Sequence, residues 1–266
     1  PAGKEDAMIV FRADGNGEIG SGHIMRCLSI AEEARERGAC CRFLLADGSM
    51  AGAIEGRGFA CDILHTHYRR MDAERGLLEP LLQQYRPKAI VVDSYFVTAG
   101  YLAWLGRFGD VTYIDDLAAF AYPAKRVVNY NIYGPGFNYE GLYKRAGVAK
   151  PRLLLGPQYA PLRRQFQNSP LREQPQIVRS ILVSTGGADP QHIALQLAGQ
   201  LAACPSGGGY EYHFILGAMN PDAGRLKEAA QACGGRVILH QNVQDMAGLM
   251  RQCDLAVSAA GSTLYE

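Results

Sequence analysis

The sequence lacks three features that would mark whole classes of protein: an excess of charge of one sign, a long apolar run, and a metal-ligand spacing. Its 266 residues carry 27 Lys plus Arg against 26 Asp plus Glu, a formal net charge of +1, so no overall basic field exists to attract nucleic acid or an anionic membrane. No apolar run reaches the ~18 residues of a membrane-spanning helix, and residues 1–7 lack the apolar stretch of a signal peptide. We therefore expect a cytoplasmic protein without nucleic-acid or membrane partners, and a monomer by default.

Cysteine and histidine are present but form no recognisable ligand pattern. The seven cysteines are odd in number, scattered and without a CxxC pair, which is typical of small core residues in a reducing compartment. The six histidines show no HExxH or related spacing. The sequence thus predicts no metal site and no cofactor.

Short β-rich runs alternate with helical patterns through the first half of the chain. A strand over 8–14 leads into a glycine loop at 15–22 and a helix over 23–37, which Gly38 ends. Further strands are expected at 41–47, 61–64, 89–95, 111–117 and 126–132, and further helices at 50–54, 72–85 and 100–108. Such alternation implies right-handed βαβ units and a doubly wound, mostly parallel sheet.

A second series of the same kind follows a change in composition. Residues 130–176 are rich in Gly, Pro, Tyr and Asn, which indicates an interdomain linker. After it, strands are expected at 180–187, 212–218, 236–240 and 254–262, and helices at 191–203, 223–233 and near Met246. The series stops at Glu266, where an open α/β domain normally continues, so we expect a truncated second domain. The predicted domains are 1–161 and 162–266.

Ligands of open α/β sheets bind beyond the carboxyl ends of the strands, so the loops there are the candidate sites. The glycines of the loop 15–22 allow close backbone approach, although their spacing is neither GxGxxG nor a Walker A loop. His23 follows at a helix N-terminus, which favours anions and disfavours a protonated imidazole, so His23 is a candidate general base. The alternative is a cap or packing residue.

Two further strand ends carry carboxylates in the first half, at Asp93-Ser94-Tyr95 and at Asp115-Asp116. Asp115 and Asp116 are expected to point to opposite sides of their strand, which argues against a shared metal ion. For Asp116 a capping or turn role is the simpler interpretation.

Small residues follow two strands of the second half, at 184–187 and at 258–263. Hydroxyls and amides at a helix N-terminus make a cradle for a diphosphate, and the carboxylate of Glu266, one turn on, would accept hydrogen bonds from ribose hydroxyls. Glycine-rich turns are common in α/β proteins, so a purely structural role stays open.

Taken together, six segments resemble one enzyme family along nearly the whole chain: FRADGNGEIGSGHIMRCLSIAEE, VVDSY, YIDD, GPQYAPLRRQF, VSTGGADP and SAAGSTLYE. They resemble the UDP-2,4-diacetamido-2,4,6-trideoxy-β-L-altropyranose hydrolases of pseudaminic acid biosynthesis. The first block matches the family pattern FRxD…IGxGHxxR most specifically, through Arg12, Asp14, Gly20, Gly22, His23 and Arg26.

The resemblance implies a fold and a set of roles. The fold would be of the GT-B type, α/β with two Rossmann-like domains whose parallel sheets face a cleft. His23 would be the catalytic base, in the N-terminal domain, and Tyr95 would belong to the site, although Ser94 stands where the family has a histidine. Ala260 stands where relatives often have glycine. The implied substrate-binding residues are Arg12, Gly20, Gly22 and, for UDP in the C-terminal domain, Arg163, Gly186, Gly187, Ser262, Thr263 and Glu266.

The reaction implied for the family is metal-independent hydrolysis of a UDP-sugar. Water deprotonated by His23 would attack the anomeric carbon with inversion, and UDP would leave. We further expect Asp14, close in sequence, to hydrogen-bond and orient the imidazole. Two alternatives remain: a GT-B glycosyltransferase in which His23 deprotonates an acceptor hydroxyl, and a non-enzymatic subunit that binds a nucleotide sugar.

Overall fold

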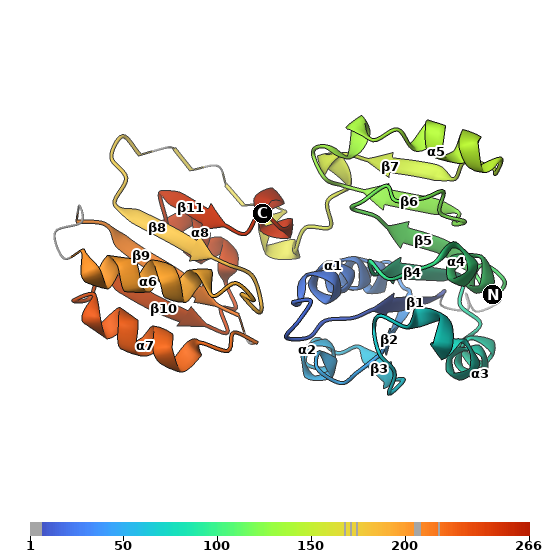
Figure 1. Cartoon of the computed structure of the whole chain (residues 1–266), viewed down its shortest axis with the longest axis horizontal. Coiled ribbons are helices and arrows are strands. Elements are labelled where there is room, and N and C mark those ends of the chain that lie inside the picture. Colours follow the sequence, from blue (N-terminus) through green and yellow to red (C-terminus); the bar gives the residue numbers. More distant parts are fainter. Residues whose placement is uncertain (1–6, 168, 171, 174, 205–208, 218) are drawn as a thin grey trace. The chain divides into compact units, whose positions relative to one another are not determined.

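The chain folds into two α/β units, each built on its own parallel sheet (Figure 1). The computed structural model describes residues 7–167, 169–170, 172–173, 175–204, 209–217 and 219–266. By contacts, unit 1 comprises residues 1–14 and 23–161, and unit 2 comprises 15–22 and 162–266. Two expectations fall on residues outside the described ranges. They are the lack of a signal-peptide run, which concerns residues 1–6, and the end of the strand expected at 212–218, which concerns residue 218.

Unit 1 holds a seven-stranded parallel sheet in the order β3-β2-β1-β4-β5-β6-β7. Its strands are β1 (Met8–Ala13), β2 (Cys40–Leu45), β3 (Ala60–Ile63), β4 (Ala89–Asp93), β5 (Asp110–Ile114), β6 (Arg126–Asn129) and β7 (Arg152–Leu155). Its helices are α1 (Gly22–Glu36), α2 (Ala51–Glu55), α3 (Arg75–Tyr85), α4 (Ala99–Leu105) and α5 (Tyr139–Ala146), with short 3₁₀ turns between them. β1 and β4 are neighbours at the centre, so the loops that follow them meet at the carboxyl edge.

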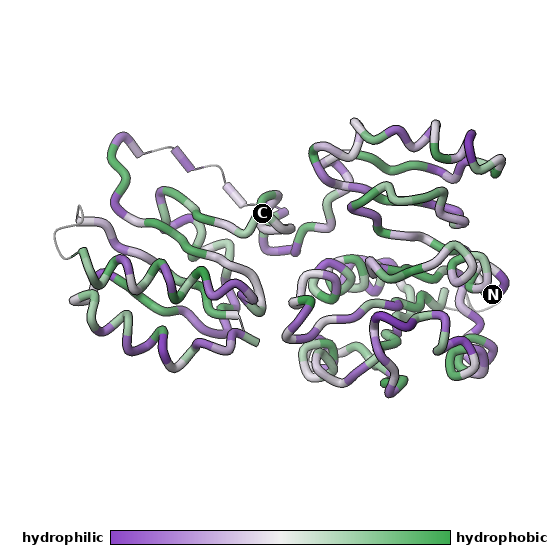
Figure 2. Tube along the Cα trace, in the orientation of Figure 1, coloured by the Kyte–Doolittle hydropathy of each residue, from purple (hydrophilic) through white to green (hydrophobic). Residues whose placement is uncertain are grey.

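The helices cover both faces of this sheet, with α1 and α2 on one side and α3 and α4 on the other (Figure 1). The larger core joins α3, α4 and α5 to apolar strand residues such as Val10, Ile90 and Val111. Burial of these strands on both faces explains their near-continuous apolar sequences, and Figure 2 shows apolar residues gathered along the strands and inner helix faces.

Local sequence signals set the helix ends. Thr98 caps α4, its hydroxyl accepting from the backbone N–H of Tyr101 at 3.0 Å, and Asn138 caps α5 by accepting from the N–H of Gly141 at 2.8 Å. Gly38 follows α1 with φ +83°, a left-handed conformation that favours glycine. The stop expected at Gly38 is therefore confirmed.

One expectation about the chain's organisation is wrong. Residues 130–176 were expected to form an interdomain linker, but they contain α5 and β7, and β7 pairs with β6 as the last strand of the first sheet. The short apolar run at 152–155 was hidden among Gly, Pro and Tyr, whose density favours a loop interpretation.

Unit 2 holds a four-stranded parallel sheet in the order β10-β9-β8-β11. Its elements are β8 (Ser180–Ser184), α6 (Ile193–Ala203), β9 (Glu211–Leu216), α7 (Ala223–Ala232), β10 (Val237–Gln241), α8 (Met246–Gln252) and β11 (Leu255–Ser258). α6 and α7 pack on one face around Phe214 and Leu226, and α8 contributes Leu249 to a smaller cluster with Leu182. The fold-class prediction of two parallel-sheet α/β units is confirmed.

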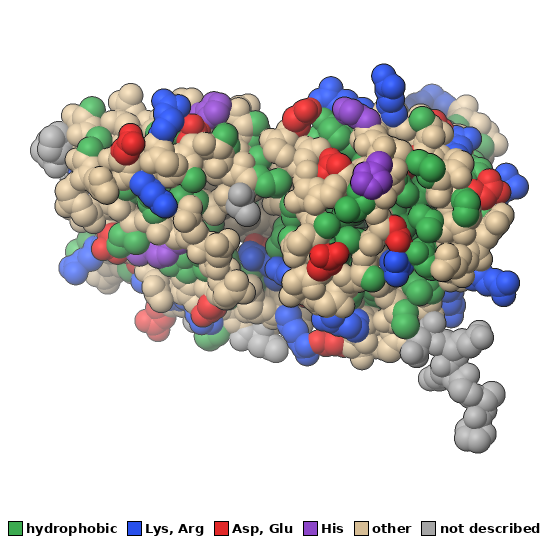
Figure 3. Space-filling view, turned by 90° about the horizontal axis from the view of Figure 1, so that it is seen from below, with side chains coloured by type: hydrophobic (Ala, Val, Ile, Leu, Met, Phe, Trp, Pro, Cys, Tyr) green, Lys and Arg blue, Asp and Glu red, His purple; other side chains and the backbone are tan. Residues whose placement is uncertain are grey.

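The face seen in Figure 3 matches the balanced composition. Cationic and anionic side chains are interspersed on the face seen in Figure 3, with no field of one sign. Among the described residues, no helix is long and apolar enough to cross a membrane.

Candidate active site at the carboxyl edge of the first sheet

His23 and Asp93 form a hydrogen-bonded pair where β1 and β4 end. His23 lies in the first turn of α1 and Asp93 is the last residue of β4. The imidazole Nδ1 lies 2.6 Å from Asp93 Oδ1, and the two side chains are 9% and 0% exposed. A carboxylate only accepts, so in the neutral imidazole Nδ1 carries the proton and Nε2 has the lone pair. Nε2 has no hydrogen-bond partner in the described part of the chain, so the pair presents a base.

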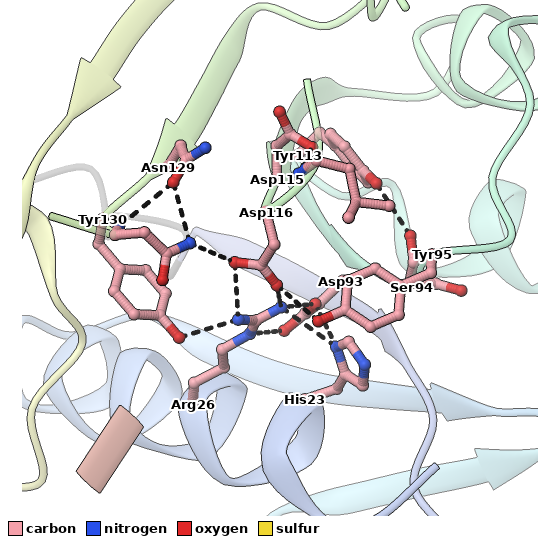
Figure 4. Close-up of polar contacts among 12 residues, drawn as sticks. His23, Arg26, Asp93, Ser94, Tyr95, Tyr113, Asp115, Asp116, Asn129 and Tyr130 are labelled. Atoms are coloured by element: carbon pink, nitrogen blue, oxygen red, sulfur yellow. Dashed lines mark hydrogen bonds and ion pairs between the residues drawn. The ribbon is translucent and has the colours of Figure 1, made fainter. Parts of the chain in front are cut away.

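Arg26 binds the same carboxylate from the next turn of α1. Its Nη2 donates to Asp93 Oδ1 at 2.6 Å and its Nε donates to Asp93 Oδ2. Its other hydrogens reach Asp116 Oδ2 at 3.0 Å and the hydroxyl of Tyr130 at 2.8 Å (Figure 4). Residues 23 and 26 share one helix face, so one helix sets both the base and the cation that steadies its partner.

The charges around Asp93 keep it ionised. Burial alone would raise the pKa of the Asp93 carboxyl, but Arg26 and His23 hold that pKa well below its ordinary value. Burial opposes the charge of Arg26 as well, yet Asp93 and Asp116 raise the pKa of its guanidinium. Burial and Asp93 also raise the pKa of the nearby Cys27 thiol, so Cys27 is an inert core residue.

Tyr95, Asp116 and Asn131 extend this network across three strand ends. Tyr95 follows β4, and its hydroxyl donates to Asp116 Oδ2 at 2.8 Å. Asn131 follows β6 and donates from Nδ2 to Asp116 Oδ1 at 2.8 Å. The Tyr95 ring meets the His23 ring edge to face, with centroids 4.7 Å apart. Tyr95, predicted from sequence as a site residue, therefore lies beside the base while half exposed.

Asp115 and Asp116 point to opposite sides, as expected. Asp115 is fully buried and accepts from the hydroxyls of Tyr122 and Tyr139 and from the backbone N–H of Leu117. Asp116 faces Arg26 instead. The simple capping role expected for Asp116 is wrong, because its oxygens bind side chains of the network.

The expected contact between Asp14 and the imidazole is also wrong. Asp14 Oδ2 accepts from Arg12 Nη1 at 2.6 Å, and Asp14 Oδ1 accepts from the backbone N–H of Ala46 at 2.7 Å. Asp14 and His23 are near in sequence, but the strand end of β4 supplies the partner. Position along the sheet edge, rather than along the chain, decides which carboxylate reaches His23.

Arg12 is misassigned as a substrate-binding residue for a related reason. Its guanidinium is 1% exposed and donates to both oxygens of Glu74, at 2.7 and 2.8 Å, as well as to Asp14. Glu74 also accepts from the Tyr101 hydroxyl at 2.5 Å. The four residues form a buried network in which no N–H of Arg12 faces solvent, so the matched motif residue serves the fold.

The glycine loop is organised by Asn16. Asn16 Oδ1 accepts from the backbone N–H of Glu18 and Ile19, at 3.0 and 3.2 Å, and the N–H of Gly20 donates to the Asn16 carbonyl at 2.8 Å. Gly20 has φ +74°, and Gly22 is the first residue of α1. The loop geometry thus requires glycine at 20, and ligand contact by Gly20 and Gly22 stays a prediction.

The predicted nucleotide loops of unit 2 are built by close backbone packing. Gly186 has φ +87°, and a Cβ on Gly217 would collide with the carbonyl oxygen of Gly187, so the loops after β8 and β9 touch backbone to backbone. Ser262 and Thr263 begin a 3₁₀ turn after β11. These four predicted residues lie in the loops at the carboxyl ends of β8 and β11, which are neighbours in the sheet.

Arg163 and Glu266, both predicted to contact the nucleotide, contact each other. Arg163 Nε and Nη2 donate to the two oxygens of Glu266 at 2.6 and 2.7 Å. Each carboxylate oxygen retains a second acceptor direction. The ion pair therefore orients Glu266 without using all of its capacity.

Of the residues in this network, the sequence indicated His23 and Tyr95 as catalytic candidates and Asp93 only as a strand-end carboxylate, and it did not indicate Asn131. The signal for Asp93 was partial, because its segment reads as a buried strand that ends in a carboxylate, whereas the position of that strand beside β1 comes from the sheet order. Asn131 lies near the end of the expected strand 126–132, but it also falls in the segment interpreted as a linker, so the sequence did not single it out. Among the described residues, no group of three or more His, Cys, Asp or Glu side chains is placed to hold a metal ion.

No protein-family model matches the chain. Of the curated relatives, a spore coat polysaccharide biosynthesis protein of Bacillus subtilis is 30% identical over 118 residues, 43% of this chain and 34% of that protein. An uncharacterised protein of Methanocaldococcus jannaschii is 20% identical over 97% of this chain and 53% of its own length. The UDP-2,4-diacetamido-2,4,6-trideoxy-β-L-altropyranose hydrolase of Campylobacter jejuni is 22% identical over 97% of this chain and 86% of its own. The matched part of the chain thus spans about a third of the length of the Bacillus protein and about half of the length of the Methanocaldococcus protein.

Solved structures with the same fold include enzymes named for nucleotide-sugar chemistry. A UDP-glucosyltransferase from Polygonum tinctorium superposes with a TM-score of 0.63 at 12% identity, covering 99% of this chain and 78% of that one. A UDP-GlcNAc 2-epimerase from Neisseria meningitidis, bound to UDP-GlcNAc, gives 0.55 at 9% identity, with 97% and 78% covered. At these identities the likeness establishes the fold, the α/β arrangement of GT-B glycosyltransferases.

Proposed function

We propose that this protein hydrolyses a UDP-linked diacetamido-trideoxy hexose, releasing UDP, in the pathway to pseudaminic acid. The observation that carries the proposal is the His23–Asp93 pair, with Nδ1 hydrogen-bonded at 2.6 Å and Nε2 left as an acceptor. The distant likeness to the Campylobacter hydrolase supports the choice of substrate, and the fold is one on which UDP-sugar enzymes are built.

In this mechanism Nε2 of His23 accepts a proton from water as the oxygen attacks the anomeric carbon. The imidazolium that forms is stabilised by Asp93, whose charge Arg26 keeps in place. The bond from the anomeric carbon to the diphosphate oxygen breaks, its electron pair leaves with UDP, and the configuration inverts. The residues proposed to hold UDP are Arg163, Gly186, Gly187, Ser262, Thr263 and Glu266.

A diphosphate is a good leaving group, so amides and hydroxyls that stabilise its developing charge can serve in place of a general acid. The proposed reaction is metal-independent. Full rate in the presence of a chelator is the expected result.

A glycosyltransferase is the second candidate, because the same His23–Asp93 pair would deprotonate an acceptor hydroxyl as readily as water. Its support is the number of structural neighbours named as glycosyltransferases. The two reactions differ in the nucleophile, which a labelling experiment identifies.

The experiment is hydrolysis of the UDP-diacetamido-trideoxy sugar in ¹⁸O-water with a chelator, by wild type and by His23→Ala. Mass spectrometry follows UDP and the label. We expect UDP release without an acceptor, one ¹⁸O in the sugar, and loss of activity in the variant. Label in UDP would refute attack at carbon, and release only when an acceptor is added would favour the transferase. Binding of the UDP-sugar without turnover under either condition would leave a non-enzymatic binding subunit.

A further inference from the structure

The polar side chains around His23 donate their hydrogen bonds to one another. Arg26 has five N–H bonds: Nε and Nη2 donate to Asp93, Nη2 and Nη1 donate to Asp116, and Nη1 donates to Tyr130. These five contacts take up the donating capacity of the guanidinium. The strongest cation of the site therefore offers no hydrogen to a ligand.

The polar side chains beside it are oriented by the same carboxylate. The Tyr95 hydroxyl gives its single hydrogen to Asp116, and burial together with Asp116 raises the pKa of that phenol, so it remains protonated at neutral pH. Asn131 gives its two Nδ2 hydrogens to Asp116 and to Asn129 Oδ1, at 2.8 and 3.0 Å. The opposite amide orientation would set two oxygens against each other, so the carboxylate fixes it.

What remains on these groups is a set of lone pairs. His23 Nε2, Tyr95 Oη and Asn131 Oδ1 can each accept a hydrogen bond. The charge count agrees, because Asp93 and Asp116 outnumber Arg26 and leave one net negative charge when the imidazole is neutral. Tyr95 is 48% exposed, which places its acceptor within reach of a ligand.

We propose that this carboxyl edge selects an uncharged glycosyl group through its O–H and N–H donors and excludes phosphate and carboxylate groups. This deepens the hydrolase proposal and rests on it for the identity of the reaction. An N-acylated amino sugar supplies such donors, and so does the attacking water. Tyr95 then becomes a specificity-determining residue whose phenolic oxygen accepts from the sugar.

The test compares UDP with a UDP-sugar, which adds the glycosyl group offered to this edge. Dissociation constants of UDP and of the UDP-diacetamido-trideoxy sugar are measured by calorimetry for wild type and Tyr95→Phe, with KM and kcat for the sugar. One hydrogen bond between uncharged groups contributes about 3- to 10-fold, so we expect kcat/KM for the sugar to fall by that factor. The dissociation constant of UDP should stay within about twofold.

Tyr85→Phe is the matched control. Its hydroxyl donates to Asp62 Oδ2 at 3.0 Å, so the substitution removes the same kind of contact from the end of α3, away from the carboxyl edge. It should leave both ligands unaffected. If Tyr95→Phe weakens UDP as much as the sugar, the phenol serves the nucleotide and the proposal is refuted.

A second comparison uses UDP-glucose and UDP-glucuronate, which differ only in the group on C6. The carboxylate of the latter would meet lone pairs and net negative charge, so we expect a dissociation constant about tenfold weaker than for UDP-glucose. Equal or tighter binding of the glucuronate would overturn the proposal. If the protein binds the intact sugar without hydrolysing it, the same dissociation constants still decide whether this edge selects hydrogen donors.

Discussion

Replacing Asp93 by asparagine changes one atom of the carboxylate and inverts the role of the imidazole. Arg26 Nη2 keeps a second acceptor in Asp116, whereas the Nε hydrogen is directed at Oδ2 of residue 93. The amide oxygen of the substituted side chain is therefore expected to turn toward Nε, and its N–H₂ group toward His23. Nδ1 of His23 must then accept, which moves the ring proton to Nε2 and removes the lone pair that activates water. Asp93→Asn is therefore expected to change the tautomer of the neutral His23 ring.

The magnitude follows from what the pair contributes. In a buried histidine–carboxylate pair, loss of the tautomer and of imidazolium stabilisation lowers kcat by about 10³- to 10⁴-fold. Breaking a buried ion pair also costs about 3–5 kcal/mol of stability, reduced here because Arg26 keeps its contacts with Asp116.

The assay is single-turnover UDP release, normalised to the folded fraction from circular dichroism. Tyr101→Phe is the control, since it removes a hydroxyl from buried Glu74 in the same unit and should lower stability while leaving kcat unchanged. An Asp93→Asn protein that is folded and within about tenfold of the wild-type kcat would refute the assignment of Asp93 as the partner that orients the base.

Three further predictions concern stability. The pKa of Asp93 is depressed in the folded protein, so its contribution to the free energy of unfolding is fully present above the unfolded pKa of about 3.9. That contribution is lost as the pH falls from there toward the folded pKa. The urea midpoints measured at neutral pH and at about one unit below the unfolded pKa should therefore differ more in wild type than in Asp93→Asn. Arg12→Leu leaves Glu74 and Asp14 buried without their cation, so we expect about 3–5 kcal/mol of destabilisation, measured by urea unfolding, whereas a solvent-facing substrate residue would lower kcat/KM alone. Ala260 has φ +58°, so Ala260→Gly should raise the stability of unit 2 by up to about 1 kcal/mol; an unchanged or lower melting temperature would contradict the left-handed conformation.

The sequence was sufficient for the architecture because strand–helix alternation and apolar runs are local signals. It failed at 152–155, where a four-residue strand is outweighed by its Gly- and Pro-rich surroundings. It also indicated His23 and Tyr95 as candidates, since a helix start and a strand end can be recognised from single segments. The partners of His23 were harder, because they depend on strand order: β4 lies beside β1, and that adjacency brings Asp93 to an imidazole 70 positions away.

Arg12 shows that a sequence motif alone does not reveal the role of a residue. It belongs to the most specific motif of the chain, yet its side chain lies on the buried side of β1 against Glu74. A motif match identifies residues that a fold or a reaction requires and does not distinguish between them. Burial and partners, which only the structure gives, make that distinction.

The back-to-back carboxylates at 115 and 116 connect two regions that would otherwise be independent. Asp115 is anchored by Tyr122 and by Tyr139 at the start of α5, while its neighbour positions Arg26, Tyr95 and Asn131. One peptide unit separates the buried Asp115 from Asp116, which contacts the residues around His23. For protein engineering, we predict that repacking α5 shifts Asp116 through its neighbour Asp115, and with it Arg26 and Tyr95, without changing any residue of that network.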